Sequence, residues 1–142
     1  MITIVNKTIH DLAKKPTKLF LIDSLGALLT TIFLFVVLRN FYEYVGMPIT
    51  VLTYLSVIAA CFCIYSTSCY FFLKENWAPF IRVISIGNLL YGILTMVLII
   101  IYYAQLKTIG MIYFEIEVII IGGLVYIELS VATAIQKDRI NK

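Results

Sequence analysis

Apolar residues fall in four long runs that are separated by short polar breaks. The runs cover approximately residues 19–41, 50–73, 78–103 and 111–135. Each run exceeds the ~20 residues that a helix needs to cross a hydrocarbon core of ~30 Å. The runs are continuous and do not alternate every second residue, as the strands of a membrane barrel would. Because helices satisfy their own backbone groups in lipid, we predict four transmembrane helices.

The breaks between the runs are short and contain turn-forming residues. Gly46 and Pro48 follow the first run, Pro79 opens the third, and Gly110 precedes the fourth. Short connections place consecutive helices side by side and antiparallel. The sequence therefore predicts an all-α fold, an up-down-up-down four-helix transmembrane bundle that spans residues 19–135.

The segments outside the bundle are short and basic. In residues 1–18, Val5, Ile9 and Leu12 recur at helical spacing with lysines between them, which predicts a short amphipathic helix on the membrane surface. A solvated tail is the alternative. Residues 136–142 are expected to form a basic tail.

Composition and charge indicate where the chain resides. Hydrophobic residues make up 62% of its 142 residues and charged residues 13%, whereas soluble domains have about 45–50% apolar and about 25% charged residues. Only Arg39 and Lys107 lie on one side of the predicted bundle. The other side holds nine basic residues, Lys7, Lys14, Lys15, Lys18, Lys74, Arg82, Lys137, Arg139 and Lys142.

This asymmetry predicts a multi-pass membrane protein with both termini in the cytoplasm. The expected partners are the lipid bilayer and either further copies of the chain or another membrane protein. A nucleic-acid partner is not indicated, because no basic patch lies on a soluble fold.

Ionisable and amide side chains inside the runs are the candidate functional residues, because such groups are costly in a bilayer. Helical spacing gives each run one small or polar face, and small residues favour contacts between membrane helices. We therefore expect Asp23, Arg82, Asn88 and Glu128 to form an intramembrane polar cluster in which Arg82 pairs with Asp23, Glu128 or both. On the outer side, Arg39 is expected to reach Glu117 or Glu115.

Two functions fit these groups. The first hypothesis is a non-enzymatic structural or interaction subunit in which the polar groups fix helix neighbours. The alternative is a small oligomeric proton-linked transporter or channel that uses the intramembrane carboxylates. No catalytic motif is present, and neither a cofactor nor a metal site is expected, since His10 is the only histidine.

Several short motifs carry a family resemblance. The segments Ile22-Asp23-Ser24-Leu25-Gly26-Ala27, Gly46-Met47-Pro48, Tyr65-Ser66, Asn88-Leu89-Leu90-Tyr91 and Tyr113-Phe114-x-Glu occur along nearly the whole chain. In this combination the chain resembles uncharacterised small four-helix bacterial integral membrane proteins. The resemblance implies a four-helix membrane fold in a bacterial inner membrane and no activity.

Overall fold

The computed structural model describes residues 1–141, which form helices joined by short connections. The elements are α1 (Ile2–Lys14), α2 (Pro16–Ile32), the π-helical segment η1 (Phe33–Leu38), α3 (Tyr42–Val45), α4 (Ile49–Phe72), α5 (Trp77–Ile101) and α6 (Thr108–Ile140). Four spans are long and apolar enough to cross a bilayer: α2 with η1, α4, α5 and α6. The all-α four-helix prediction with a short N-terminal helix is confirmed, and the chain is a membrane protein by the length and apolar character of these helices.

The observed helix ends differ from the predicted ones mainly in the first and last spans. Pro16 opens α2 in its first turn, where a proline is tolerated because its missing N–H would have no helical partner. The last helix continues to Ile140. Residues 136–140 therefore extend α6 and do not form a separate tail, while Lys142 lies outside the described residues.

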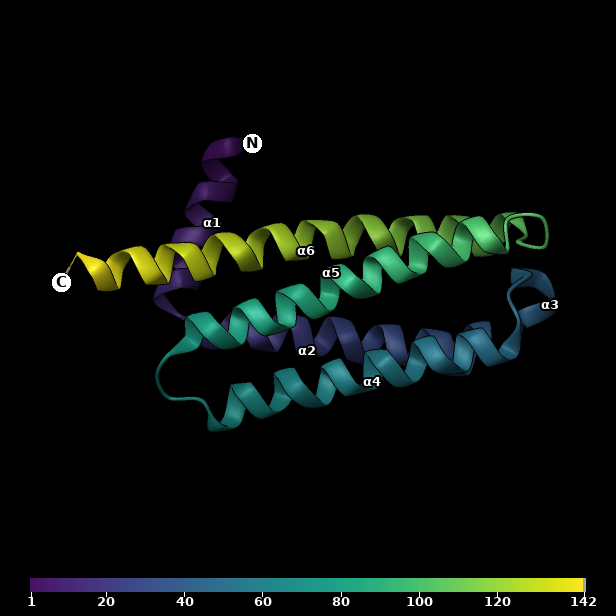
Figure 1. The fold of residues 1–142 in the computed structure, drawn as a ribbon, viewed down its shortest axis with the longest axis horizontal. Helices are drawn as coiled ribbons and strands as arrows, with labels where there is room; N and C mark the ends of the chain where they lie inside the picture. Colours follow the sequence, from purple (N-terminus) through teal and green to yellow (C-terminus); the bar gives the residue numbers. More distant parts are fainter. Residues whose placement is uncertain (142) are drawn as a thin grey trace.

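The four spans form two antiparallel hairpins that lie side by side (Figure 1). One hairpin pairs α2 with α4 and the other pairs α5 with α6, and contacts within each hairpin are far more numerous than those between them. The end of α6 and the junction of α1 with α2 lie at one end of the bundle, here called the terminal end, and α3 lies at the other, here called the α3 end. The short helix α1 crosses the bundle at the terminal end and packs against α6 and α2.

Backbone contacts hold the two hairpins together at the α3 end. Gly46 has a φ of +80°, and an added Cβ there would lie 2.1 Å from the carbonyl oxygen of Gln105. The backbone N–H of Lys107 donates a hydrogen bond of 3.0 Å to the carbonyl of Val45. A Cβ on Gly110 would lie 2.3 Å from the same Val45 oxygen. The glycines thus permit a close approach of the two loops that no other residue would allow.

The buried core consists of two apolar clusters separated by polar side chains. The first cluster lies toward the α3 end, and Leu34, Leu52 and Phe114 are among its fully buried members. The second lies toward the terminal end and includes Phe20, Ile81 and Leu12 of α1. Eight polar residues are buried in the bundle, namely Asp23, Ser56, Ser66, Ser85, Asn88, Thr95, Glu117 and Glu128.

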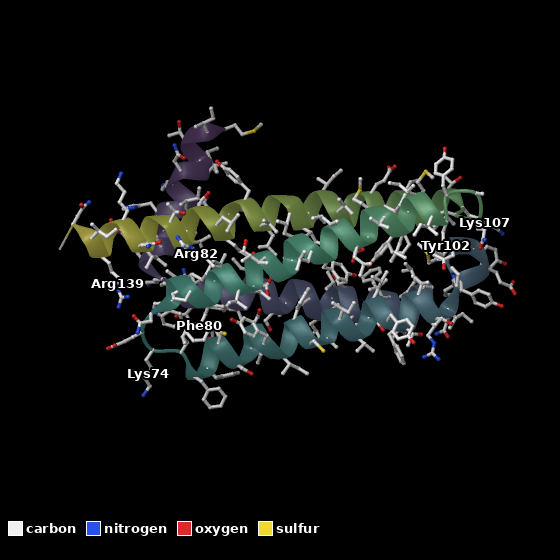
Figure 2. All side chains as sticks on the ribbon, in the orientation of Figure 1. Lys74, Phe80, Arg82, Tyr102, Lys107 and Arg139 are labelled. Carbon is white, nitrogen blue, oxygen red and sulfur yellow. The ribbon has the colours of Figure 1, made fainter. Side chains whose placement is uncertain are left out.

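Basic side chains are unevenly distributed along the long axis. Lys74, Arg82 and Arg139 lie toward the terminal end, whereas Lys107 lies at the α3 end (Figure 2). The fold therefore separates the charges in the way that the loop sequences imply.

Candidate intramembrane polar site

The polar face of α5 points into the bundle. Ser85, Asn88, Gly92 and Thr95 are all buried, because residues spaced by three and four share one helix face. The spacing predicts a small or polar face on this run that also includes Arg82, and the face is confirmed for these four residues, whereas Arg82 is exposed. Asn88 lies eleven residues after the start of α5, which places it ~17 Å along the helix, near the middle of the span.

Asn88 joins side chains from both hairpins. Its Nδ2 donates a hydrogen bond of 2.8 Å to Oδ1 of Asp23 on α2. The same nitrogen lies 3.3 Å and 3.4 Å from Oε1 and Oε2 of Glu128 on α6. The hydroxyl of Ser66 on α4 donates to Oδ2 of Asp23. All four transmembrane helices thus contribute one residue, and we call Asp23, Ser66, Asn88 and Glu128 the Asn88 network.

The expected ion pair of Arg82 with Asp23 or Glu128 is wrong. Arg82 is exposed, and its Nη2 donates a hydrogen bond to Oε1 of Gln136. Arg82 lies six residues, or ~9 Å, closer to the terminal end than Asn88 does. Asp23 lies seven residues after the start of α2 and reaches the level of Asn88. The pairing prediction therefore placed Asp23 too close to the helix end, and a guanidinium near that end costs less when it faces outward.

The other buried carboxyl group belongs to Glu117, which is 7% exposed. Oε1 of Glu117 accepts a hydrogen bond of 3.2 Å from the hydroxyl of Tyr91. Oε2 of Glu117 has no hydrogen-bond partner, and it is the one buried side-chain polar atom in residues 1–141 that lacks one. We call Glu117 and Tyr91 the Glu117 site.

The expected pair of Arg39 with Glu117 is also wrong, and Glu115 does not replace Glu117 as the partner of Arg39. The guanidinium of Arg39 lies 4.7 Å from the centre of the Phe35 ring. Glu115 is exposed. Glu117 points inward toward Tyr91, whereas Arg39 follows η1 at the end of its span, so the two side chains do not meet in the described chain.

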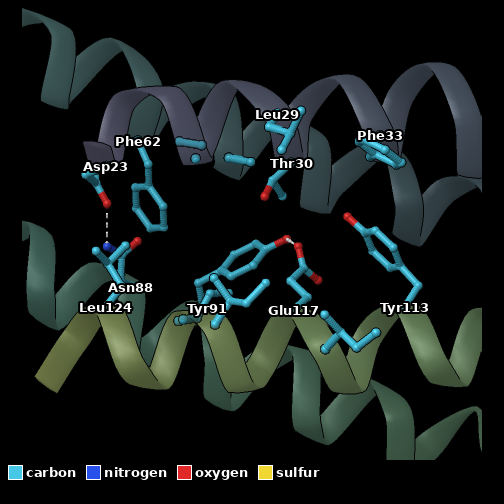
Figure 3. A pocket seen from close by; sticks show the side chains of 16 residues that line it. Asp23, Leu29, Thr30, Phe33, Phe62, Asn88, Tyr91, Tyr113, Glu117 and Leu124 are labelled. Carbon is cyan, nitrogen blue, oxygen red and sulfur yellow. Dashed lines mark hydrogen bonds between the residues drawn. The ribbon is translucent and has the colours of Figure 1, made fainter. Parts of the chain in front are cut away.

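A cavity of about 250 Å³ lies between the hairpins and connects the two groups. Asp23 and Asn88 line one end, Glu117 and Tyr91 lie along it, and Tyr113 stands beyond Glu117 (Figure 3). The rest of the lining is predominantly apolar. Its remaining residues are Gly26, Ala27, Leu29, Thr30, Phe33, Ala59, Phe62, Ile116, Ile120, Ile121 and Leu124.

The cavity reaches the outside of the bundle between α2 and α6. Leu29 of α2 is 58% exposed, and Ile116 and Ile120 of α6 are 52% and 63% exposed, although all three line the cavity. In a membrane-spanning region such exposed side chains face lipid. The mouth of the cavity therefore opens toward the bilayer.

An irregular helix borders the same mouth. α2 becomes π-helical at Phe33, whose ring stacks on that of Tyr113 at a centroid distance of 6.3 Å. Phe33 and Tyr113 both line the cavity. Short π-helical segments are often found at functional sites, which is consistent with a site at this position.

Sequence reasoning did not assign roles to Ser66 and Tyr91 in these groups. Ser66 lies on the predicted small-residue face of α4, so its inward direction was available from the spacing. Tyr91 follows Asn88 by three residues and shares its face. Its link to Glu117 depends on how α5 rotates against α6, which no spacing rule specifies.

Comparisons of the chain with protein-family models, curated proteins and solved structures found no match.

Proposed function

We propose that this protein binds a small molecule in its intramembrane cavity and exchanges it for protons, as a proton-linked transporter. The observation that carries the proposal is the cavity itself, which extends between the hairpins from the Asn88 network to the unpaired oxygen of Glu117. Ligand sites are concave and mostly apolar and carry a few convergent polar groups. Two polar groupings along one apolar cavity fit that description.

The Asn88 network supplies a reason for coupling. It links α2 and α4 of one hairpin to α5 and α6 of the other through hydrogen bonds that end on Asp23 and Glu128. Adding or removing a proton on either carboxyl group changes which of these bonds are favourable. The helices of one hairpin come much closer to each other than to the helices of the other hairpin, so the proton state of the network would bias the separation of the hairpins. Intramembrane carboxyl groups with such neighbours commonly serve proton relays in transporters.

The proposed orientation places both termini in the cytoplasm of a bacterial cell, in the inner membrane. It is supported by the clustering of basic side chains toward the terminal end. A cysteine introduced near Lys74, by Asn76→Cys, is then expected to resist an impermeant thiol reagent in whole cells and to react after lysis. Reaction in intact cells would reverse the orientation.

Occupancy of the cavity can be tested with a reporter cysteine. Cys61, Cys63 and Cys69 are replaced by alanine, and Gly26→Cys is introduced, because a Cβ at Gly26 meets no heavy atom within 4 Å and the residue lines the cavity. The probes are three compounds with one benzyl body: benzyltrimethylammonium, neopentylbenzene and phenylmethanesulfonate. At least one probe is expected to slow labelling of Gly26→Cys by N-ethylmaleimide in proteoliposomes. The matched control is Leu25→Cys, which is exposed outside the cavity and should not be protected.

Proton coupling is tested on the same vesicles with a pH-sensitive dye inside. The probe that protects Gly26→Cys should evoke a proton flux in the protein with native Asp23, and Asp23→Asn or Glu128→Gln should remove the flux while protection remains. If no probe protects the reporter cysteine, or if flux is unchanged in both variants, the proposal is wrong.

A second candidate, a structural or interaction subunit, is favoured by the outer face of α6. A Cβ on Gly122 or Gly123 would meet nothing within 4 Å, and both glycines are exposed. Small residues on an open helix face allow close approach of a second membrane helix. If the chain assembles through this face, Gly123→Leu should reduce the oligomer mass measured by light scattering in detergent, and Ile112→Leu on an exposed part of the same helix should not.

A further inference from the structure

The composition of the cavity wall restricts the charge of its occupant. Two residues of the wall, Asp23 and Glu117, carry carboxyl groups, and in the described chain no lysine, arginine or histidine lines the cavity. The two oxygens of Asp23 accept hydrogen bonds from Asn88 and Ser66. Glu117 retains one unpaired oxygen, so the buried side-chain atom of this wall that lacks a partner is an acceptor.

Burial makes that free acceptor significant. Buried polar atoms are nearly always hydrogen-bonded, because leaving one unpaired loses its interaction with water without replacement. Among the residues that the structure describes, Oε2 of Glu117 is the buried side-chain polar atom without a hydrogen-bond partner, and it belongs to a residue that lines the cavity. A ligand that brings a positive charge or an N–H donor to this oxygen would supply the missing interaction.

Aromatic rings stand beside the same carboxyl group. Tyr91 and Tyr113 flank Glu117 in the close view of the cavity (Figure 3), and Phe33 stacks on Tyr113. The faces of aromatic rings attract cations through their negative quadrupole. A cationic head near Glu117 would therefore meet both a carboxyl group and π faces.

The entrance restricts the remainder of the occupant. The mouth is bordered by exposed apolar side chains of α2 and α6 that face lipid, among them Leu29 and Ile120. A molecule that enters there must partition into the bilayer. The apolar lining toward Leu124 and Ile121 then offers a surface for its hydrophobic part.

We infer that the cavity takes a lipophilic cation whose charged head lies against Glu117 and whose apolar part lies along α2 and α6. This inference rests on the proposed function, since it names the class of molecule that the cavity binds. Glu117 is a binding residue in this assignment, separate from the Asn88 network that is proposed to carry the proton.

The benzyl probes separate the inference from the proposal on which it rests. Benzyltrimethylammonium and neopentylbenzene have the same shape and differ in one positive charge. The cation should protect Gly26→Cys at a concentration at least about tenfold lower than phenylmethanesulfonate does. Glu117→Gln should weaken protection by the cation about tenfold, which is the expected effect of losing a contact to a charged group. Glu115→Gln, the same change at an exposed position two residues away, should leave protection by the cation unchanged.

The outcomes distinguish two kinds of failure. Protection by neopentylbenzene or phenylmethanesulfonate that equals or exceeds protection by the cation overturns the inference and leaves the proposed function in place. Equal protection by the cation in wild type and in a folded Glu117→Gln variant also overturns it. Protection by no probe removes both.

A second measurement does not depend on the folding of a Glu117 variant. The reporter cysteine at Gly26 is treated in detergent with two methanethiosulfonate reagents, one with a cationic trimethylammonium-ethyl group and one with an anionic sulfonatoethyl group. The rate at which each reagent modifies this cysteine is divided by its rate at Leu25→Cys. A higher ratio for the cationic reagent is expected in a cavity lined by carboxyl groups. A higher ratio for the anionic reagent would contradict cation selection.

Discussion

The Asn88 network and the Glu117 site both bury a carboxyl group in the span, but they differ in how fully its oxygens are bonded. In the network, Asp23 accepts from Asn88 and Ser66, and Glu128 accepts from Asn88. At the Glu117 site, Tyr91 bonds one oxygen and the other has no partner. The two groups open on the same cavity.

This difference suits the Asn88 network to holding helices together and the Glu117 site to binding another molecule. A carboxyl group with complete partners from several helices fixes how those helices pack, since each bond is lost when a helix moves. A carboxyl group with a free oxygen beside an open volume contributes little to packing and retains an interaction for another molecule. Because buried polar atoms cost free energy when unpaired, the stability of the folded protein should depend strongly on the network and weakly on the Glu117 site.

The largest effect is expected from Asn88→Leu. The substitution removes the donor shared by Asp23 and Glu128 and leaves two buried carboxyl groups with fewer partners. We expect the free energy of unfolding, measured by SDS titration in mixed micelles, to fall by about 2–3 kcal/mol.

The control for this prediction is Asn40→Leu. The Asn40 side chain bonds only the carbonyl of Val36 in its own helical segment and is exposed. An equal loss in the two variants would show that the network has no special role. Replacing Asp23, Asn88 and Glu128 together by leucine should restore much of the stability, because the three apolar side chains require no hydrogen-bond partners.

Some of the features that form the Asn88 network and the Glu117 site could be predicted from the sequence. Long apolar runs specify the helices, and spacings of three and four identify the inward face of α5, including Ser85 and Asn88. The partners across helices could not be predicted, since they depend on the depth and rotation of each helix. α2 starts at Pro16, so Asp23 meets Asn88 instead of Arg82.

The cavity could not be predicted from the sequence for a related reason. Its volume depends on how far apart the two hairpins pack, which follows from the summed shapes of many side chains. The loop contact of Gly46 with Gln105 helps to fix that spacing at the α3 end. A glycine in a turn indicates a backbone requirement, but it does not indicate which other loop approaches it.

A smaller loss is expected from Ser66→Ala, which removes one of the two donors to Asp23. The free energy of unfolding should fall by about 1.5 kcal/mol, toward the upper end of the values measured for hydrogen bonds between membrane helices. Ser68→Ala provides the control on the same helix, because the Ser68 hydroxyl is exposed and bonds its own helix at Ile64. If the two serine variants are equally stable, the Ser66–Asp23 contact does not contribute.

Substitution at the Glu117 site should change the free energy of unfolding in the opposite direction. Glu117→Leu removes a buried oxygen that has no partner and replaces the side chain by an apolar one of similar size, and these gains offset the loss of the acceptor of the Tyr91 hydroxyl. The free energy of unfolding should stay unchanged or rise by up to about 1 kcal/mol. A clear loss of stability would show that Glu117 is a structural residue like those of the network, and would weaken the distinction between the two groups.

The smallest loss of stability is expected from Tyr91→Phe, which removes the hydrogen-bond donor to Oε1 of Glu117. The loss should be about 0.6 kcal/mol, the average for such bonds in a membrane interior. A double-mutant cycle tests its origin: in a Glu117→Leu background the hydroxyl has lost this acceptor, so Tyr91→Phe should cost nothing further through this contact. Tyr126→Phe, the same change at an exposed tyrosine of α6 outside the cavity, serves as the comparison and should leave stability unchanged. Additive effects of the Tyr91 and Glu117 substitutions would mean that the Tyr91 hydroxyl stabilises the fold independently of Glu117, and the Glu117 site would then be a carboxyl group with no stabilising partner at all.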